Sequence, residues 1–314
     1  MLEGVVIKST GKWYQVMQKD GGVVTCRIRG KFRMDDLRST NPVAVGDRVL
    51  FILESDNTGV IHKIEERYNI LVRKSINLSK RTQILAANID RVYLLVTLAL
   101  PETHLAFIDR FLVAAESFRI PATLLFNKID IYDEEDLPIV HNVMAIYEKI
   151  GYPCHKISAL NKENIDFLKS EINEKQVMIG GHSGTGKSTL INALDASLQI
   201  QTGAISAHHL QGQHTTTFAE MHPLASGGYI IDTPGIRAFG IIDLEKQFIS
   251  HYFPEMRELL NECKFHNCLH LNEPKCAVKE KVATGEIAES RYASYVSLMQ
   301  EDENENYRKD IYGD

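Results

Sequence analysis

The chain of 314 residues is long for a single domain, and at roughly 100–200 residues per domain it predicts two or three domains. Hydrophobic residues make up 44% and charged residues 24% of the chain, as in soluble globular proteins, which excludes a disordered or fibrous chain. The net charge of −6 is unevenly distributed, because residues 1–85 carry +6 (15 Lys and Arg against 9 Asp and Glu) and residues 86–314 carry −12.

No targeting or membrane segment is visible in the sequence. The most nearly continuous apolar run, residues 92–100, is much shorter than the about 20 residues that a membrane-spanning helix needs. The first residues lack a basic start followed by an apolar stretch, so no secretory signal is expected. Five cysteines are an odd and low number for this length, which argues against a disulfide scaffold and for a reducing compartment. We therefore expect a cytoplasmic protein without membrane contact.

Residues 1–68 are predicted to form a small all-β barrel. β-Branched and aromatic runs at residues 4–10, 12–17, 23–30 and 47–55 are separated by turns that contain Gly, Asn and Pro. Short strands at this density are typical of an OB-fold. The positive charge favours contact with a polyanion such as RNA, although small β domains often carry a few extra lysines without binding one. Residues 69–85 hold four basic residues and no acidic one, and are predicted to be a basic linker.

Residues 86–245 change to alternating strands and helices. Buried strands are predicted at 91–99, 122–130, 154–158, 176–184 and 227–235, and helices at 103–118, 137–150 and 163–173. Alternation at this spacing predicts an α/β domain whose mostly parallel sheet is covered by helices on both faces.

A phosphate-binding loop follows the predicted strand at 176–180. Residues 181–188 match the pattern G-x-x-x-x-G-K-[ST] between a strand and a helix, which is the context that this motif requires. The glycines let backbone N–H groups surround phosphates at a helix N-terminus. Lys187 would reach the β and γ phosphates, and the hydroxyl of Ser188 would bind Mg²⁺. The predicted phosphate-contacting residues are Gly181, His182, Ser183, Gly184, Thr185, Gly186, Lys187, Ser188 and Thr189.

Two further segments match the parts of a nucleotide switch. Asp232 opens the sequence D-T-P-G at the end of a buried strand, where a second Mg²⁺ contact is needed, and Gly235 can offer its N–H to a γ-phosphate. The polar run at 212–217 contains three consecutive threonines, one of which would bind Mg²⁺ when the γ-phosphate is present. We favour Thr216, with Thr215 as the alternative.

The base is predicted to be guanine. Residues 127–130 read N-K-I-D after a buried strand, and the carboxylate of Asp130 can accept from guanine N1–H and N2–H₂, a donor pair that adenine lacks. Asn127 would bridge loops and contact the base edge, and the stem of Lys128 would cover the ring. Ser158 and Ala159 after the next strand supply the second half of a guanine pocket.

The order of these motifs is unusual. The guanine motifs at 127 and 158 precede the phosphate loop at 181, the threonines at 215 and D-T-P-G at 232, whereas most GTPases begin with the phosphate loop. The sequence therefore predicts a circularly permuted P-loop GTPase domain. The sheet can stay the same, because a permutation only relocates the chain ends.

Residues 246–314 are predicted to be a mostly helical zinc-binding domain. Cys263, Cys268, His270 and Cys276 supply three thiolates and one imidazole within fourteen residues, which is a ligand set for one closed, structural Zn²⁺ site. His266 is a competing ligand. Residues 286–300 have helical spacing and are expected to pack on this zinc module, whereas Cys26 and Cys154 lie in strand-like segments and are expected in the core.

Together these features closely resemble the YjeQ/RsgA family of bacterial GTPases that depend on the small ribosomal subunit. The resemblance covers nearly the whole chain and implies a late assembly factor of that subunit. It would bind GTP or GDP with Mg²⁺, dock on the rRNA of the immature subunit in the GTP state, and leave after hydrolysis that the ribosome stimulates. We expect a monomer. The alternatives are a zinc-containing RNA-binding protein that GTP switches for another RNA partner, and an ATP-dependent enzyme.

The catalytic group is expected to be His214. The residue after D-T-P-G is Ile236, whose apolar side chain cannot orient a water molecule as a glutamine does in Ras-like enzymes. The sequence alone leaves His214 open between a solvated loop histidine and a catalytic one, and the family resemblance implies catalysis. Positioning of the attacking water is favoured over full proton abstraction.

Overall fold

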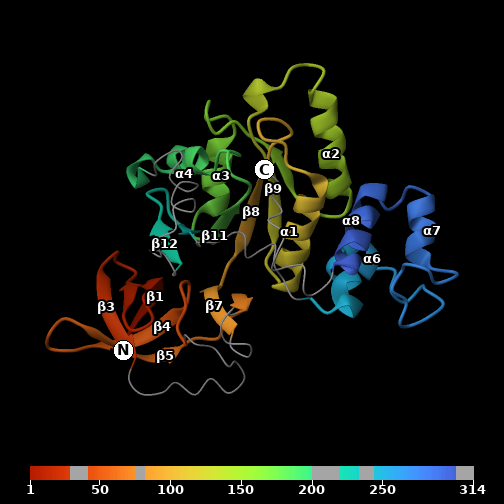
Figure 1. The fold of residues 1–314 in the computed structure, drawn as a ribbon. Helices are drawn as coiled ribbons and strands as arrows, with labels where there is room; N and C mark the ends of the chain where they lie inside the picture. Colours follow the sequence, from red (N-terminus) through yellow and green to blue (C-terminus); the bar gives the residue numbers. More distant parts are fainter. Residues whose placement is uncertain (29–41, 75–81, 200–218, 233–243, 302–314) are drawn as a thin grey trace.

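The computed structural model describes residues 1–28, 42–74, 82–199, 219–232 and 244–301. The protein contains a β-barrel, a central α/β domain and a C-terminal helical module, and the barrel and the module contact the central domain at different places (Figure 1). No helix in the described ranges has the length and apolar character needed to cross a membrane.

The N-terminal domain is a closed five-stranded barrel, as the sequence predicts. It consists of β1 (Leu2–Ser9), β2 (Tyr14–Met17), β3 (Val23–Ile28), β4 (Arg48–Leu53) and β5 (Gly59–Ile64). The strands follow the order β1-β2-β3-β5-β4, and β4 pairs again with β1 to close the barrel. Alternate residues such as Tyr14 and Val16 point inward, where they pack with Cys26 and Phe51 in an apolar core.

A hairpin joins the barrel to the central domain. Strands β6 (Ile70–Lys74) and β7 (Thr82–Ala87) pair antiparallel over the predicted basic linker, 69–85, and the first residues of the next predicted domain. The N–H of Ala87 donates to Val45 O at 2.8 Å, and Asn88 Nδ2 donates to Gly46 O at 3.0 Å. Gly46 has a φ of +89°, and a Cβ there would lie 2.0 Å from Ala87 O. The hairpin therefore meets the barrel by a backbone approach that requires glycine.

The central sheet has the predicted parallel strands. It consists of β8 (Arg91–Val96), β9 (Ala122–Phe126), β10 (Cys154–Lys156), β11 (Gln176–Gly180), β12 (Glu220–Pro223) and β13 (Tyr229–Asp232), in the order β10-β9-β8-β11-β13-β12. Helices α1 (Leu105–Ser117) and α2 (Leu137–Lys149) pack on one face, and α3 (Ile165–Ile172) and α4 (Lys187–Leu194) on the other. Short 3₁₀ turns lie at η1 (Ile129–Ile131) and η2 (Ala196–Leu198).

The direction of strand addition reverses between β8 and β11. The chain adds β9 and β10 on one side of β8, and then returns to place β11 on its other side. In open α/β sheets, ligands bind outside the carboxyl ends of the strands at such a reversal. The loops that follow β8 and β11 are therefore the expected walls of the functional site.

The last strand of the central sheet, β12, is antiparallel, and no sequence pattern predicts it. It pairs with β13 on one side, and on the other side Glu220 lies opposite Lys8 of β1. Lys8 Nζ and Glu220 Oε2 are 3.0 Å apart. The central sheet thereby continues into the barrel.

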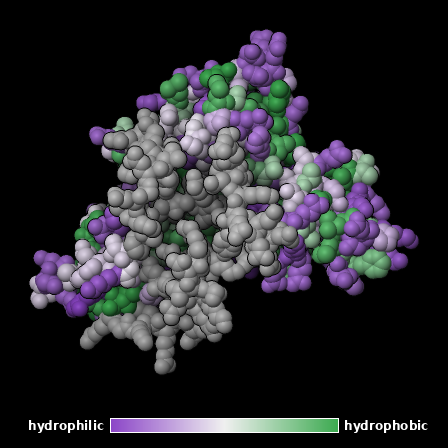
Figure 2. All heavy atoms as spheres, in the orientation of Figure 1, coloured by the Kyte–Doolittle hydropathy of each residue, from purple (hydrophilic) through white to green (hydrophobic). Residues whose placement is uncertain are grey.

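The C-terminal module packs on helix α1. It consists of η4 (Lys246–Tyr252), α6 (Pro254–Arg257), α7 (Ala277–Ala283) and α8 (Glu289–Gln300). Its apolar core includes Phe253, Met256, Val278 and Tyr295, and also Val113 of α1. Polar side chains cover much of its outward surface (Figure 2).

We predict that Gly46→Ala lowers stability much more than Gly11→Ala. Both glycines have positive φ values, +89° and +82°, so alanine is strained at both, at about 1–2 kcal/mol. A Cβ at position 11 meets nothing within 4 Å, whereas a Cβ at position 46 collides with Ala87 O and adds about 1–3 kcal/mol of overpacking. Thermal unfolding midpoints measure the difference, and equal losses for the two variants would contradict the close approach.

Candidate functional site

The phosphate loop connects β11 to α4 and takes its shape from three glycines. Gly181, Gly184 and Gly186 have φ values of +143°, +82° and +99°, which side-chain-bearing residues rarely adopt. A Cβ on Gly186 would lie 2.5 Å from Asn127 Nδ2, so the loop also needs glycine for space. Ser183 and Gly184 are exposed, and Ser188 and Thr189 are half-buried in the first turn of α4. The loop thus presents backbone and hydroxyl groups at a helix N-terminus, an arrangement that can receive phosphates.

Lys187 lies inside the curl of this loop. Its Nζ donates to Gly181 O at 2.8 Å and also to His182 O. Burial lowers the pKa of Lys187 to about 8, because removing the ammonium from water disfavours its charged form. Phosphate oxygens can replace these carbonyls as acceptors, and they would stabilise the charge more strongly because they are anionic.

Asn127 holds three loops together. Its side chain is buried, with Nδ2 donating to Thr185 O at 2.8 Å and Oδ1 accepting from the N–H of Ala159 at 3.0 Å. The first bond joins the loop after β9 to the phosphate loop, and the second joins it to the loop after β10. The structure thus brings the motif of Asn127 together with two motifs whose contacting residues lie 32 and 58 positions away along the sequence.

The residues expected to select the base also lie together. Ser158 Oγ donates to Asp130 Oδ1, and in turn accepts from the N–H of Asn161 at 3.0 Å. These bonds fix the carboxylate at the carboxyl end of β9. Lys128 has a φ of +65°, and its Nζ donates to Leu100 O. Its stem therefore runs across the space between the base loop and the loop that follows β8.

The loop after β8, residues 97–104, contributes to the site although the sequence did not predict it. Pro101 Cδ lies 3.2 Å from where a Cβ of Gly184 would be, so this loop flanks the phosphate loop. The N–H of Leu98 donates to Tyr132 OH at 2.7 Å, which ties it to the base loop as well. No motif marks this segment, and only its position at the end of a central strand could have indicated its role.

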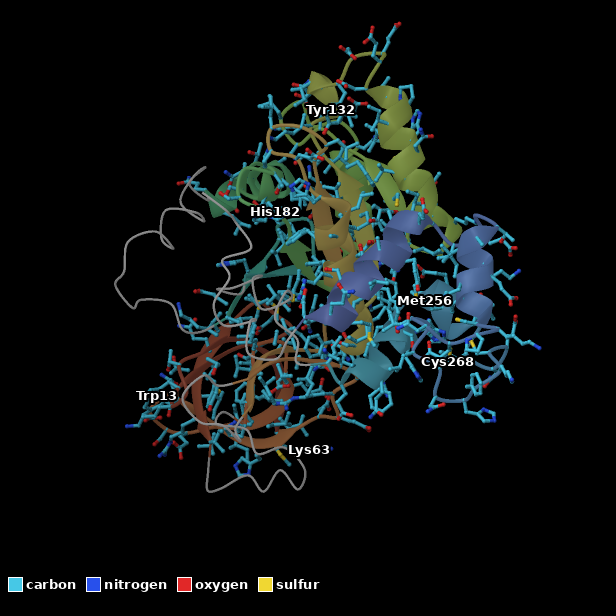
Figure 3. All side chains as sticks on the ribbon, turned by 45° about the vertical axis from the view of Figure 1, so that its right-hand side comes forward. Trp13, Lys63, Tyr132, His182, Met256 and Cys268 are labelled. Atoms are coloured by element: carbon cyan, nitrogen blue, oxygen red, sulfur yellow. The ribbon has the colours of Figure 1, made fainter. Side chains whose placement is uncertain are left out.

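Helix α1, which follows that loop, reaches the phosphate loop. The rings of Phe107 and His182 have centroids 3.7 Å apart. Burial, with the nearby charge of Lys187 as a lesser cause, lowers the pKa of His182 to about 4, so this histidine is neutral at pH 7. In Figure 3, His182 lies near α4 in the central domain, away from Met256 and Cys268 of the C-terminal module.

Several expected residues lie outside the described part of the chain. They are Thr215, Thr216, His214 and Gly235. Asp232 is described only as the last residue of β13, which neighbours β11 in the sheet through the pair Met178 and Ile231. The backbone of Asp232 therefore ends on the same sheet edge as the phosphate loop.

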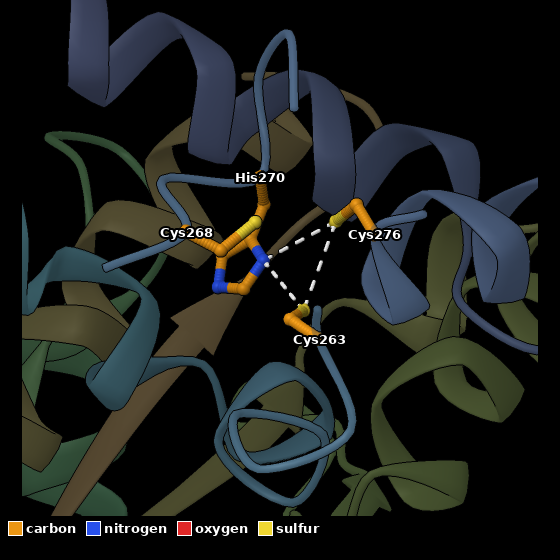
Figure 4. A group of neighbouring side chains, drawn as sticks. All are labelled: Cys263, Cys268, His270 and Cys276. Carbon is orange, nitrogen blue, oxygen red and sulfur yellow. Dashed lines mark hydrogen bonds between the residues drawn. The ribbon is translucent and has the colours of Figure 1, made fainter. Parts of the chain in front are cut away.

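The C-terminal module contains a cluster of potential metal ligands. The ligand atoms of Cys263, Cys268, His270 and Cys276 all lie within 4.8 Å of one another. His270 Nδ1 is 3.4 Å from Cys276 Sγ and 3.6 Å from Cys263 Sγ, and the two sulfurs are 4.0 Å apart (Figure 4). Tetrahedral zinc with bonds of about 2.0–2.3 Å separates such atoms by about 3.5–3.8 Å, so the cluster fits this ion.

The surroundings of the cluster favour a structural metal. Burial raises the pKa of the Cys268 thiol to about 12, and a bound dication would supply the charge that stabilises thiolates. Glu273 accepts from the N–H groups of Leu269, Leu271 and Asn272, at 3.0, 2.9 and 3.1 Å, and thereby fixes the turn between the ligands. His270 is buried and is part of the cluster, whereas His266 is exposed and is not. Cys26 and Cys154 are buried core residues, as expected.

Known proteins resemble the chain over its full length. A family model described as the RsgA GTPase matches residues 64–242, and one described as the RsgA N-terminal domain matches residues 3–61. The small ribosomal subunit biogenesis GTPase RsgA of Christiangramia forsetii is 55% identical over 99% of both chains, and that of Bacteroides fragilis is 52% identical over 98% of this chain and 99% of its own.

Solved structures agree with these relatives. YjeQ from Thermotoga maritima superposes with a TM-score of 0.78 at 35% identity, covering 98% of this chain and 99% of its own. YloQ, described as a circularly permuted GTPase, superposes with a TM-score of 0.75 at 30% identity, covering 99% and 97%. Both the motif order and the sheet order agree with the permutation that the sequence predicts. The chain is therefore a circularly permuted GTPase that belongs to the RsgA family.

Proposed function

We propose that this GTPase is a late maturation factor of the small ribosomal subunit, and that it acts in the cytoplasm as a monomer. The observation that carries the proposal is Asn127, whose two hydrogen bonds bring a guanine motif, its Ser-Ala partner and a phosphate loop into one site. The partner is suggested by the names of relatives that are aligned over the whole chain, which call them small ribosomal subunit biogenesis GTPases.

The predicted site residues would each contact one part of the nucleotide or its Mg²⁺ ion. Asp130 would accept from the guanine edge, and Asn127, Lys128, Ser158 and Ala159 would complete the base pocket. The phosphates would lie along residues 181–189, with Lys187 on the β and γ groups and the N–H of Gly235 on the γ group. The Mg²⁺ ion that accompanies GTP would be held by Ser188, Thr216 and Asp232.

The N-terminal and C-terminal domains would act in binding to the small subunit. The barrel, residues 1–68, and the basic linker, 69–85, would contact rRNA, because phosphates attract their excess of positive charge. The GTPase domain, 86–245, would then pass its nucleotide state to the domain at 246–314, where Cys263, Cys268, His270 and Cys276 hold one structural zinc ion. After docking in the GTP state, His214 would position the attacking water, and hydrolysis would release the factor.

We predict that His214→Ala keeps the protein on the small subunit. Without the group that aligns water, GTP binding and docking should survive while the stimulated hydrolysis falls, by about 10²–10⁴-fold if His214 is a general base and by less if it only positions water. Co-sedimentation with small and large subunits, with GTP, GDP and a non-hydrolysable GTP analogue, measures docking. Stimulated hydrolysis equal to wild type would remove His214 from the mechanism, and nucleotide-dependent binding to another RNA instead of the subunit would replace the proposed partner.

We predict that Asp130→Asn shifts the preference from GTP toward XTP. The amide of asparagine offers a donor where the carboxylate accepted, so it repels guanine N1–H and suits the additional carbonyl of xanthine. Competition binding of GTP, XTP and ATP measures the change, and Asp133→Asn, at an exposed position outside the pocket, is the control. An unchanged ratio of GTP to XTP affinity would show that Asp130 does not read the base.

We predict that Cys268→Ser loses the metal and destabilises the C-terminal module. Zinc contributes roughly 10–16 kcal/mol to the folding of isolated fingers, so a missing thiolate should loosen residues 263–300 and weaken subunit binding. Metal analysis and hydrogen exchange measure the two effects. Cys154→Ser, at a buried cysteine outside the cluster, should keep the zinc content. Wild-type protein purified without zinc would contradict the site.

A further inference from the structure

Helix α1 belongs to two packing units at once. Ile108, Leu112 and Ala115 face the core of the GTPase domain, whereas Val113 lies in the core of the C-terminal module. Positions 108, 112 and 115 follow helical spacing, and so do 109, 113 and 116, which lie on the adjoining face. A displacement of this helix would therefore be felt in both units.

The first half of α1 contacts the nucleotide loop. Phe107 lies against His182 with ring centroids 3.7 Å apart, at an angle of 35°. One turn later, Phe111 packs so closely on Gly180 that a Cβ there would lie 2.7 Å from its ring. Gly180 is the last residue of β11, immediately before the phosphate loop. The position of α1 and the shape of that loop are thus mutually constrained.

The same half of α1 carries a buried charge pair to the module. Asp109 Oδ1 accepts from Arg291 of α8 at 2.8 Å and from Tyr147 OH at 2.9 Å, and Arg291 Nε donates to Glu255 at 2.7 Å. The side chains of Asp109 and Arg291 are 0% and 1% exposed. The guanidinium also lies 4.6 Å from the centre of the Phe253 ring. Burial opposes the charge of Arg291, but the two carboxylates outweigh this effect and raise its pKa.

Helix α8 continues the connection to the metal ligands. Tyr292 OH donates to His270 O at 2.7 Å, and Tyr295 OH donates to Leu269 O at 2.6 Å. These two tyrosines lie within about one helical turn of Arg291 and hold the backbone of the ligand loop. Contacts therefore run without interruption from the phosphate loop through α1 and α8 to the zinc loop.

We propose that the Asp109–Arg291 pair couples the phosphate loop to the zinc module, so that nucleotide binding changes the stability of the module through α1 and α8. The proposal rests on GTP binding at the proposed site. The coupling would pass through packed side chains and not through the chain connection at residues 233–243. The route is stiff because Arg291 cannot separate from α1 without leaving Asp109 buried and uncompensated, which is strongly unfavourable. By linkage, the module must affect nucleotide affinity by the same factor.

The test is hydrogen exchange of the zinc-containing protein, with and without a non-hydrolysable GTP analogue and Mg²⁺. In the wild type we expect the amides of residues 263–300 to exchange at least about fivefold more slowly with nucleotide than without it. Arg291→Met alone would leave two buried carboxylates without a cationic partner and can unfold the module. The main variant is therefore the uncharged triple substitution Asp109→Asn, Glu255→Gln, Arg291→Met. It should keep its zinc and lose the nucleotide response of residues 263–300.

The control variant is Lys149→Gln. Lys149 Nζ donates to Glu286 O at 2.7 Å, so it crosses the same interface from α2 at an exposed position. It should keep the full response. The coupling alone would be overturned if the triple variant responded to nucleotide as strongly as the wild type. It would also be overturned if nucleotide protected the phosphate loop of the wild type but left the exchange of residues 263–300 unchanged. Absence of nucleotide binding in the wild type would instead overturn the proposed GTP site.

Discussion

The site depends on one buried amide. Asn127 satisfies its Nδ2 only when Thr185 O is in place and its Oδ1 only when the N–H of Ala159 is in place. An unsatisfied buried polar group costs about 1–3 kcal/mol, so the three loops stabilise one another's positions. The requirement is spatial and places no condition on the order of the loops along the chain. The permuted order can therefore form the same site, since the strands that carry the three loops still end side by side.

Where a structural feature depends on a short local pattern, the sequence is enough to predict that feature. The phosphate loop needs glycines at fixed offsets between a strand and a helix, and φ values of +143°, +82° and +99° confirm that need. The metal cluster is also predictable from a local pattern, because thiols at such spacing in a polar stretch have few roles other than metal binding. The sequence placed His270 in the ligand set and left His266 as a competing ligand, and in the fold His270 is buried in the cluster while His266 is exposed.

The features that the sequence did not reveal are all relations between distant elements. Asp109 and Arg291 are 182 positions apart, and each reads as an ordinary charged position on an amphipathic helix. The helical pattern at 286–300 correctly indicated packing on the C-terminal module, but one of the two most buried residues of that helix is an arginine, Arg291. Burial of a charge is predictable only once its partner is known, and no local pattern names the partner.

Two of the ion pairs that link the GTPase domain to its neighbours differ in physical character. Lys8 and Glu220 join the barrel to β12 with side chains 39% and 38% exposed, so water and salt screen the pair and it contributes at most about 1 kcal/mol. Asp109 and Arg291 are almost completely excluded from water, and separating them would leave buried charges without a partner. The first pair can therefore exchange its partner for another charged group, such as a phosphate, at small cost. The second pair cannot be exchanged in this way, and it holds helix α8 of the C-terminal module against helix α1.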